Sequence, residues 1–240
     1  MTRGILLDIE GTTTPISFVF DVLFPYARRH LVDYLERNFD LAEVRADIAA
    51  LNQEHAKDLT NGSQPPPVTE QDIVEYAYWL MDRNSKSTAL KSLQGKIWQE
   101  GYINGELKAT VFPDVRPAME RWHNAGINVS IFSSGSVLAQ QLLFSHTEAG
   151  NLAELINCYF DTQVGKKTDA ASYKEISRAL SLAPDQIHFV SDVIAELDAA
   201  SEAGMQTSLC IRPGNMAQEP NAKHETIRTF DLLVIERGQP

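Results

Sequence analysis

Two kinds of apolar pattern alternate along the second half of the chain. Short runs rich in Ile, Val and Phe, typical of buried strands, alternate with segments whose apolar side chains recur every three or four residues, as in amphipathic helices. The pattern predicts strands at 3–8, 128–132, 158–161, 187–191 and 207–211, and helices at 115–125, 136–146, 169–182 and 194–203. This alternation indicates an α/β fold with a doubly wound parallel sheet and helices on both of its faces.

Residues 18–108 follow a different pattern. Apolar side chains there keep helical spacing and show no strand-like alternation, apart from an interruption rich in Pro at 60–67. We expect an all-helical insert whose first helix, at 18–40, breaks near Pro25, because proline lacks the N–H for a helical hydrogen bond. The expected domains are a core of residues 1–17 and 109–240 and a helical domain of residues 18–108.

Polar side chains follow the ends of three predicted strands. Asp8 ends the first strand and Glu10 follows it, Ser133 and Ser134 follow the second, and Asp192 follows a later one. Ligands of open α/β sheets bind at this edge, outside the carboxyl ends of the strands. Carboxylates there can bind Mg²⁺ or act as nucleophiles, and small polar residues before a helix leave N–H groups facing an anion. Each element taken alone is equally typical of a turn or a cap.

The loop before the helix at 169–182 adds positive charge. It holds Lys166 and Lys167, either of which can oppose the charge of a phosphoryl group. Asp161 and Asp169 in the same region are interpreted as turn and helix-cap residues. The ordered set of an acidic strand end, a Ser/Gly nest, a lysine and a second acidic strand end indicates phosphoryl chemistry more strongly than any of its parts.

In this order the four segments resemble the motifs of the haloacid dehalogenase-like phosphohydrolases. A closer resemblance, to the enolase-phosphatases of methionine salvage, rests on Glu10, where most of the superfamily has Asp, and on three further segments. These are Leu23-Phe24-Pro25-Tyr26, Ser133-Ser134-Gly135-Ser136 and Ile211-Arg212-Pro213-Gly214-Asn215. The resemblance runs from residue 5 to about residue 215. It implies a haloacid dehalogenase-like Rossmannoid core with the helical insert as a cap over the strand ends.

The requirements of phosphate ester cleavage and the resemblance together assign roles. Asp8 and Asp192 fit as carboxylate ligands of one Mg²⁺ per subunit. The resemblance implies that Asp8 is also the nucleophile that forms an aspartyl phosphate. It further implies that Glu10 binds the metal through its backbone carbonyl, which leaves its side chain for proton transfer. For Glu196, on the helix after Asp192, support of the metal site and a solvated helix face remain open.

The phosphate group is expected to bind Ser133, Ser134 and Lys167. The two serines would hold its oxygens through hydroxyl and backbone N–H groups, and Lys167 would supply a positive charge. The glycine-x-lysine pattern of the family favours Lys167 over Lys166.

The resemblance implies a two-step reaction. The enzyme would enolise 2,3-diketo-5-methylthiopentyl-1-phosphate and then remove phosphate, which gives the acireductone 1,2-dihydroxy-3-keto-5-methylthiopentene. A generic capped small-molecule phosphatase is the alternative within the same superfamily. A non-enzymatic phosphate-binding regulator is disfavoured because every acidic and basic role is filled.

The composition limits the binding partners and the cellular compartment that we expect for this protein. The 240 residues carry 21 basic and 32 acidic side chains, a net charge of −11 that opposes nucleic acid and anionic membranes. An anionic substrate therefore needs local positive groups and a metal. The two cysteines lie far apart without a CxxC pairing, and the residues before Asp8 are too few for a signal peptide. We expect a cytoplasmic monomer whose partner is a small phosphorylated diketone.

Overall fold

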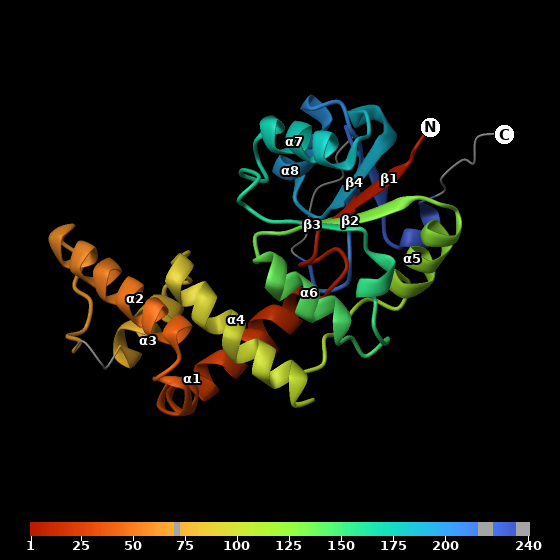
Figure 1. The fold of residues 1–240 in the computed structure, drawn as a ribbon. Coiled ribbons are helices and arrows are strands. Elements are labelled where there is room, and N and C mark those ends of the chain that lie inside the picture. Colours follow the sequence, from red (N-terminus) through yellow and green to blue (C-terminus); the bar gives the residue numbers. More distant parts are fainter. Residues whose placement is uncertain (70–72, 216–222, 234–240) are drawn as a thin grey trace. The chain divides into compact units, whose positions relative to one another are not determined.

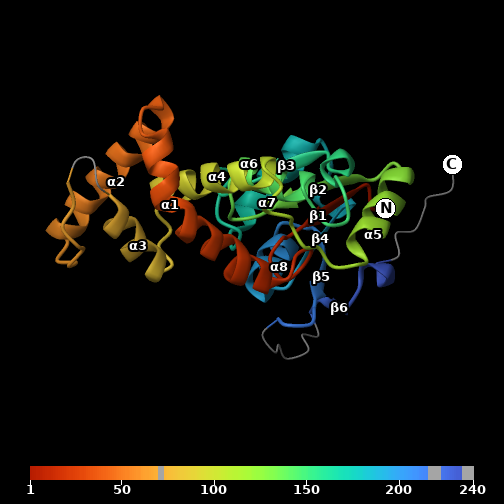
Figure 2. The same cartoon turned by 90° about the horizontal axis from the view of Figure 1, so that it is seen from below.

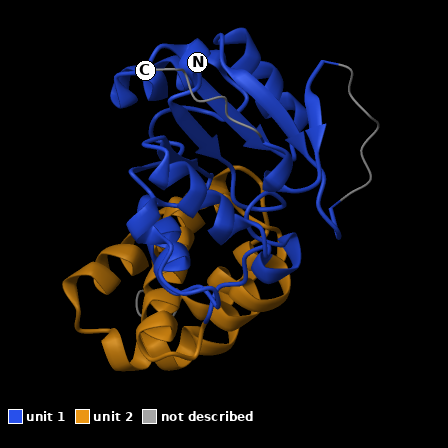
Figure 3. Ribbon diagram, turned by 90° about the vertical axis from the view of Figure 1, so that its right-hand side faces the viewer, with its two compact units in different colours: residues 1–19, 108–240 blue, residues 20–107 orange. Residues whose placement is uncertain are grey.

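The computed structural model describes residues 1–69, 73–215 and 223–233. The chain forms two compact units, drawn in different colours in Figure 3. The core unit comprises residues 1–19 and 108–240, and the helical unit comprises residues 20–107. The chain passes from one unit to the other after residue 19 and again after residue 107. Both positions lie within two residues of the boundaries expected from the apolar pattern.

The core unit is built on one six-stranded sheet in which every pairing is parallel. The strand order is β3-β2-β1-β4-β5-β6, and Figure 2 shows β1, β4, β5 and β6 in succession. The strands are β1 (Gly4–Leu7), β2 (Asn128–Phe132), β3 (Cys158–Phe160), β4 (Ile187–Ser191), β5 (Gln206–Cys210) and β6 (Glu225–Ile227). The predicted α/β class is confirmed. The strand β6, near the C-terminus, was not predicted.

Four helices cover the sheet (Figure 1): α5 (Val115–Asn124), α6 (Val137–Ser145), α7 (Ala170–Leu180) and α8 (Ile194–Glu202). Helices α7 and α8 share a buried cluster with the sheet, which includes Leu6, Phe132, Phe189, Leu209, Tyr173, Ile176 and Leu197. Helix α5 contacts β2, and α6 contacts β3. Because all four residues of β1 are buried, the segment that delivers Asp8 lies in the middle of the core. Short 3-10 helices occur at Ala153–Leu155, Pro184–Gln186 and Phe230–Leu232.

Two helices of the core begin at side-chain caps next to the predicted site. Ser136 accepts a hydrogen bond from the N–H of Ala139 at the start of α6, and Asp169 accepts one from Ala171 at the start of α7. Asp161 accepts hydrogen bonds from the backbone N–H groups of Gln163 and Val137. Asp161 and Asp169 are thus turn and cap residues, as interpreted from the sequence. These bonds fix the loops on either side of the lysine segment.

The helical unit contains α1 (Phe24–Asn38), α2 (Ala42–Thr60), α3 (Val74–Asp82) and α4 (Thr88–Ile103). A π-helical stretch, Phe18–Leu23, leads into α1. The expected break falls just before Pro25, which occupies the first turn of α1, where a missing N–H costs no hydrogen bond. Helix α4 packs against α1 and α2, and strands are absent from the described residues of this unit. None of the described helices is long and apolar enough to cross a lipid bilayer.

Candidate active site

Residues 8–14, which we call the nucleophile loop after the role predicted for Asp8, turn sharply at the end of β1. The Asp8 N–H donates to the Val190 carbonyl, so the loop starts while the chain is still paired with β4. The Ile9 carbonyl then accepts hydrogen bonds from the N–H groups of Thr12, Thr13 and Thr14, at 3.2, 3.0 and 2.9 Å. No described residue donates to the Glu10 carbonyl. The loop therefore presents a buried carboxylate and a backbone oxygen close together.

Lys167 lies between two carboxylates. Its Nζ is 2.5 Å from Asp8 Oδ1 and 2.6 Å from Glu196 Oε2, and all three side chains are largely buried. Lys166 is exposed, so of the two candidates the structure brings only Lys167 to Asp8. The Lys167 side chain reaches the site from the loop before α7, where the Tyr173 hydroxyl donates to its carbonyl at 2.7 Å.

Glu196 belongs to the site and not to a solvated helix face. Besides Lys167, it accepts a hydrogen bond from Ser191 Oγ at 3.0 Å, and that hydroxyl also lies 3.5 Å from Asp8 Oδ2. The N–H of Val193 donates to Ser191 Oγ. Glu196 holds the ammonium group of Lys167, which faces the predicted nucleophile Asp8. In the sequence, the only indication of this role was that Glu196 follows Asp192 by about one helical turn.

The two serines differ in their environments. Ser133 is buried, and its backbone N–H donates to the Phe160 carbonyl at 3.1 Å, which takes away a donor expected for phosphate. Its hydroxyl accepts a hydrogen bond from the Gly135 N–H at 3.1 Å and lies close enough to the Glu10 carboxylate to lower the pKa of that group. Ser134 is exposed, and its backbone N–H has no acceptor among the described residues. Ser134 is therefore the better backbone donor for an incoming anion.

The donor atoms at the strand ends suit a hard cation. Asp8 and Asp192 supply carboxylate oxygens, and the Glu10 carbonyl supplies a third oxygen with no competing donor among the described residues. Mg²⁺ binds to oxygen ligands of this kind and keeps part of its own hydration. No group of three His, Cys, Asp or Glu side chains converges on a metal position within residues 1–69, 73–215 and 223–233. The candidate metal site thus combines two carboxylates with a backbone oxygen.

The crowding of carboxylates shifts their proton affinities. Burial, and then the charge of Asp8, raises the pKa of both Glu10 and Glu196. Burial, followed by the charges of Asp8 and Glu196, raises the pKa of Asp192 to about 7. Burial alone would lower the pKa of Lys167, but the negative charges of Asp8 and Glu196 outweigh the effect of burial and raise this pKa. Lys167 is therefore an ammonium ion at neutral pH.

We expect Asp192→Asn to stabilise the metal-free protein above pH 7. A carboxyl group whose pKa is raised on folding favours the folded state only while it is protonated, so the unmodified protein loses stability as pH rises toward 7. Between the ordinary value of 3.8 and about 7, the loss is at most about 4 kcal/mol, since a tenfold change in proton affinity is worth about 1.4 kcal/mol. Chemical unfolding at pH 8 and at pH 5 in EDTA measures the gain, which should shrink at pH 5.

The control for this change is Asp198→Asn on the same helix as Glu196. Asp198 is half-buried and pairs with Lys223 and His224, and these partners lower its pKa. Its replacement should bring no stabilisation at either pH. Equal unfolding free energies for Asp192→Asn and the unmodified protein at pH 8 would contradict the conclusion that burial and neighbouring carboxylates raise the pKa of Asp192.

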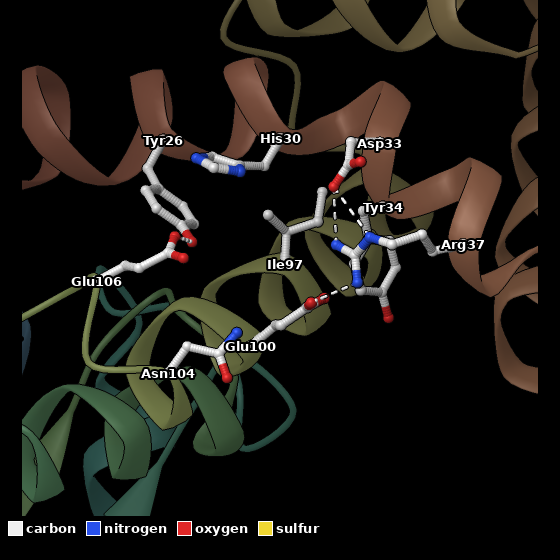
Figure 4. A pocket seen from close by; sticks show the side chains of 9 residues that line it. All are labelled: Tyr26, His30, Asp33, Tyr34, Arg37, Ile97, Glu100, Asn104 and Glu106. Atoms are coloured by element: carbon white, nitrogen blue, oxygen red, sulfur yellow. Dashed lines mark hydrogen bonds and ion pairs between the residues drawn. The ribbon is translucent and has the colours of Figure 1, made fainter.

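A separate cavity of about 170 Å³ lies wholly within the helical unit, between α1 and α4 (Figure 4). It is lined by Tyr26, His30, Asp33, Tyr34, Arg37, Ile97, Glu100, Asn104 and Glu106. Arg37 pairs with Asp33 and Glu100, and the Tyr26 hydroxyl donates to Glu106. None of the predicted site residues lines this cavity. Its lining holds three carboxylates and one arginine, an excess of negative charge that disfavours a phosphate group there.

Comparison with known proteins shows the family of the chain. The family model of the haloacid dehalogenase-like hydrolases matches residues 2–204, and the chain belongs to that family. The chain is 51% identical over 232 residues to the enolase-phosphatase E1 of Synechococcus elongatus, covering 95% of this chain and 96% of that protein. Its identity to the enolase-phosphatase E1 of Danio rerio is 39% over 248 residues, covering 98% and 95%. Within the family, the chain therefore groups with the enolase-phosphatases.

A solved structure supports the fold over the same length. The crystal structure of the UTR4 protein of Saccharomyces cerevisiae matches with a TM-score of 0.79 and 32% sequence identity. The match covers 97% of this chain and all of that one.

Proposed function

We propose that the protein is a Mg²⁺-dependent enolase-phosphatase of methionine salvage. It enolises 2,3-diketo-5-methylthiopentyl-1-phosphate and then hydrolyses the phosphate ester, releasing the acireductone. The observation that carries the proposal is the contact of Lys167 with both Asp8 and Glu196, which joins three of the four motif segments at one edge of the sheet. The family and the full-length relatives support the same activity. The enzyme works as a cytoplasmic monomer with one Mg²⁺ per subunit.

In the phosphatase step, Asp8 attacks phosphorus. One carboxylate oxygen of Asp8 forms a bond to phosphorus while the bond to the ester oxygen breaks, which leaves an aspartyl phosphate that water then hydrolyses. The Lys167 ammonium offsets negative charge on the phosphoryl oxygens, and Glu196 holds that ammonium in place. Ser134 donates its free N–H to a phosphoryl oxygen. Bound Mg²⁺, held by Asp8, Asp192 and the Glu10 carbonyl, supplies charge neutralisation and polarises the substrate oxygens.

In the enolase step, Glu10 takes a proton from the carbon that bears the phosphate ester, and the neighbouring carbonyl oxygen, which gains the negative charge, takes a proton from water to give the enol. That carbon is bonded to the ester oxygen, so the same carboxyl group can later return the proton to the departing oxygen. The pKa of Glu10, raised by burial and by Asp8, suits a group that must both accept and release a proton near neutral pH. The Ser133 hydroxyl works against this rise and favours the charged form of the Glu10 carboxylate.

We expect Glu10→Gln to impair both steps. An amide cannot accept the carbon-bound proton or return it, so deuterium exchange at that carbon and phosphate release should each fall about 100-fold or more. NMR of the substrate in D₂O follows the exchange, and a phosphate assay follows the hydrolysis. Full exchange in this variant would place the enolisation base elsewhere. Glu148→Gln, at an exposed position outside the motif segments, serves as the control and should leave both rates unchanged.

Substrate discrimination tests the proposal against a generic phosphatase. Purified protein with Mg²⁺ is assayed on the diketo phosphate and on p-nitrophenyl phosphate, and kcat/KM is compared. An enolase-phosphatase should prefer the diketo phosphate by orders of magnitude. Comparable values for the two esters would favour the generic phosphatase.

A further inference from the structure

The turn after β5 carries two side chains that bind the nucleophile loop. Asn215 Nδ2 donates to the Gly11 carbonyl at 2.9 Å, and Arg212 Nε donates to the Thr12 carbonyl at 3.1 Å. The Asn215 N–H closes the turn on the Arg212 carbonyl at 3.2 Å. Pro213 and Gly214, the latter with φ of +87°, stand at the two central positions, as a type II turn requires. One tight turn thus holds two successive carbonyls of the loop.

Arg212 anchors this turn in the core. Its guanidinium lies 4.6 Å from the ring centres of both Phe112 and Phe230, and Nη1 pairs with Asp114 at 2.9 Å. Asp114 also accepts a hydrogen bond from the Phe230 N–H at 2.6 Å. Because Arg212 is buried and bonded on several sides, the short turn fixes the position of Asn215 as well.

The Asn215 amide bridges the nucleophile loop to Asp192. Its Nδ2 donates to Asp192 Oδ2 at 3.2 Å as well as to the Gly11 carbonyl. Both partners are acceptors, so the nitrogen and not the oxygen must face them. Asn215 Oδ1 is buried and has no partner among the described residues. This oxygen is available to a donor that arrives with the cation or the substrate.

Gly11 makes the bridge possible. Its φ is +76°, and a Cβ added there would lie 2.3 Å from Asp192 Oδ2 and 3.0 Å from Asn215 Nδ2. The Asp192 carboxylate therefore rests directly on the backbone of Gly11, and the Asn215 amide ties the two together. Any side chain at position 11 would occupy the space in which the Asp192 carboxylate packs.

We propose that Asn215 is a positioning residue that orients the Asp192 carboxylate for Mg²⁺ binding. The inference rests on the metal site of the proposed function and adds a residue that acts through Asp192. Loss of the amide removes the hydrogen bond that ties this carboxylate to the backbone of Gly11, while Asp8 and Lys167 keep their own contacts. Partners that orient metal ligands in this way are commonly worth 10- to 100-fold in metal affinity.

Calorimetric titration of the full-length protein with MgCl₂, without substrate, tests the inference. Asn215→Ala is expected to weaken Mg²⁺ binding about tenfold or more. In steady-state assays the same variant should need correspondingly more Mg²⁺ for half activity. At saturating Mg²⁺, its kcat and its KM for the diketo phosphate should return close to those of the unmodified protein. Asn215→Ser should have the same effects as Asn215→Ala, because the serine hydroxyl is too short to bridge the Gly11 carbonyl oxygen and Asp192 Oδ2.

Asn151→Ala is the matched control. Asn151 is exposed and donates to Glu154 at 2.9 Å, so its loss should leave Mg²⁺ affinity unchanged. Unchanged Mg²⁺ affinity in both Asn215 variants, even with a lowered melting temperature, would overturn the inference and leave Asn215 a purely structural role. If the unmodified protein bound no Mg²⁺, both the metal site of the proposed function and the inference about Asn215 would be contradicted.

Discussion

Asp8→Asn is expected to reduce phosphate release at least about 1000-fold, because an amide has neither the charge nor the nucleophilicity to attack phosphorus. The change keeps the shape of a side chain that is 3% exposed in the middle of the core, so the fold should remain intact. Solvent deuterium exchange at the carbon bearing the phosphate should persist, since the proposed mechanism assigns that proton to Glu10 and not to Asp8. A phosphate assay and NMR in D₂O measure the two effects separately.

Asp47→Asn is the matched control for this change. Asp47 is also buried, but it lies on α2 of the helical unit and pairs with Lys96. Its replacement should leave phosphate release near that of the unmodified protein. Near-normal phosphate release by Asp8→Asn would remove Asp8 from the role of nucleophile.

The second large effect is expected for Lys167→Ala. In the proposed mechanism the ammonium group offsets charge on the phosphoryl group in the transition state, and removing one such group typically costs 100- to 1000-fold in kcat. The change also leaves Asp8 and Glu196 buried without their cation, which should cost about 3–5 kcal/mol of unfolding free energy in the absence of metal. Steady-state kinetics and chemical unfolding of the same preparation measure both effects.

The neighbouring lysine supplies an internal control. Lys166 is exposed, so Lys166→Ala should leave kcat and stability almost unchanged. Mg²⁺ affinity should change little in either variant, because neither lysine binds the metal. A larger loss of activity for Lys166→Ala than for Lys167→Ala would show that the phosphate-facing lysine has been misassigned.

Much of the fold could be predicted because buried parallel strands and amphipathic helices have distinct apolar periods. Strands β2 and β4 have the bounds that their apolar runs predict. The short strand β6, Glu225–Ile227, escaped prediction because two of its three residues are exposed at the edge of the sheet. The π-helical entry to α1 was also missed, since helical spacing alone does not distinguish it from an α-helix.

The site was predictable where chemistry follows a strand end. Asp8, Asp192 and Lys167 stand at positions that parallel topology brings to one edge. The loss of the Ser133 backbone donor was not predictable, because it depends on pairing with Phe160 of the neighbouring strand. Asn215 was overlooked for a related reason. Its contacts with Gly11 and Asp192 are more than 20 residues distant in sequence, and only the Pro213-Gly214 turn hinted at a fixed position.

The most direct test of the central claim is a time course with the unmodified protein, Mg²⁺ and 2,3-diketo-5-methylthiopentyl-1-phosphate. Enol absorbance and free phosphate are recorded together after rapid mixing. The account predicts that enol absorbance rises first and that phosphate follows, with no phosphate formed when EDTA removes the metal. Phosphate release that precedes or bypasses the enol, or an enol that forms without any phosphate release, would contradict it.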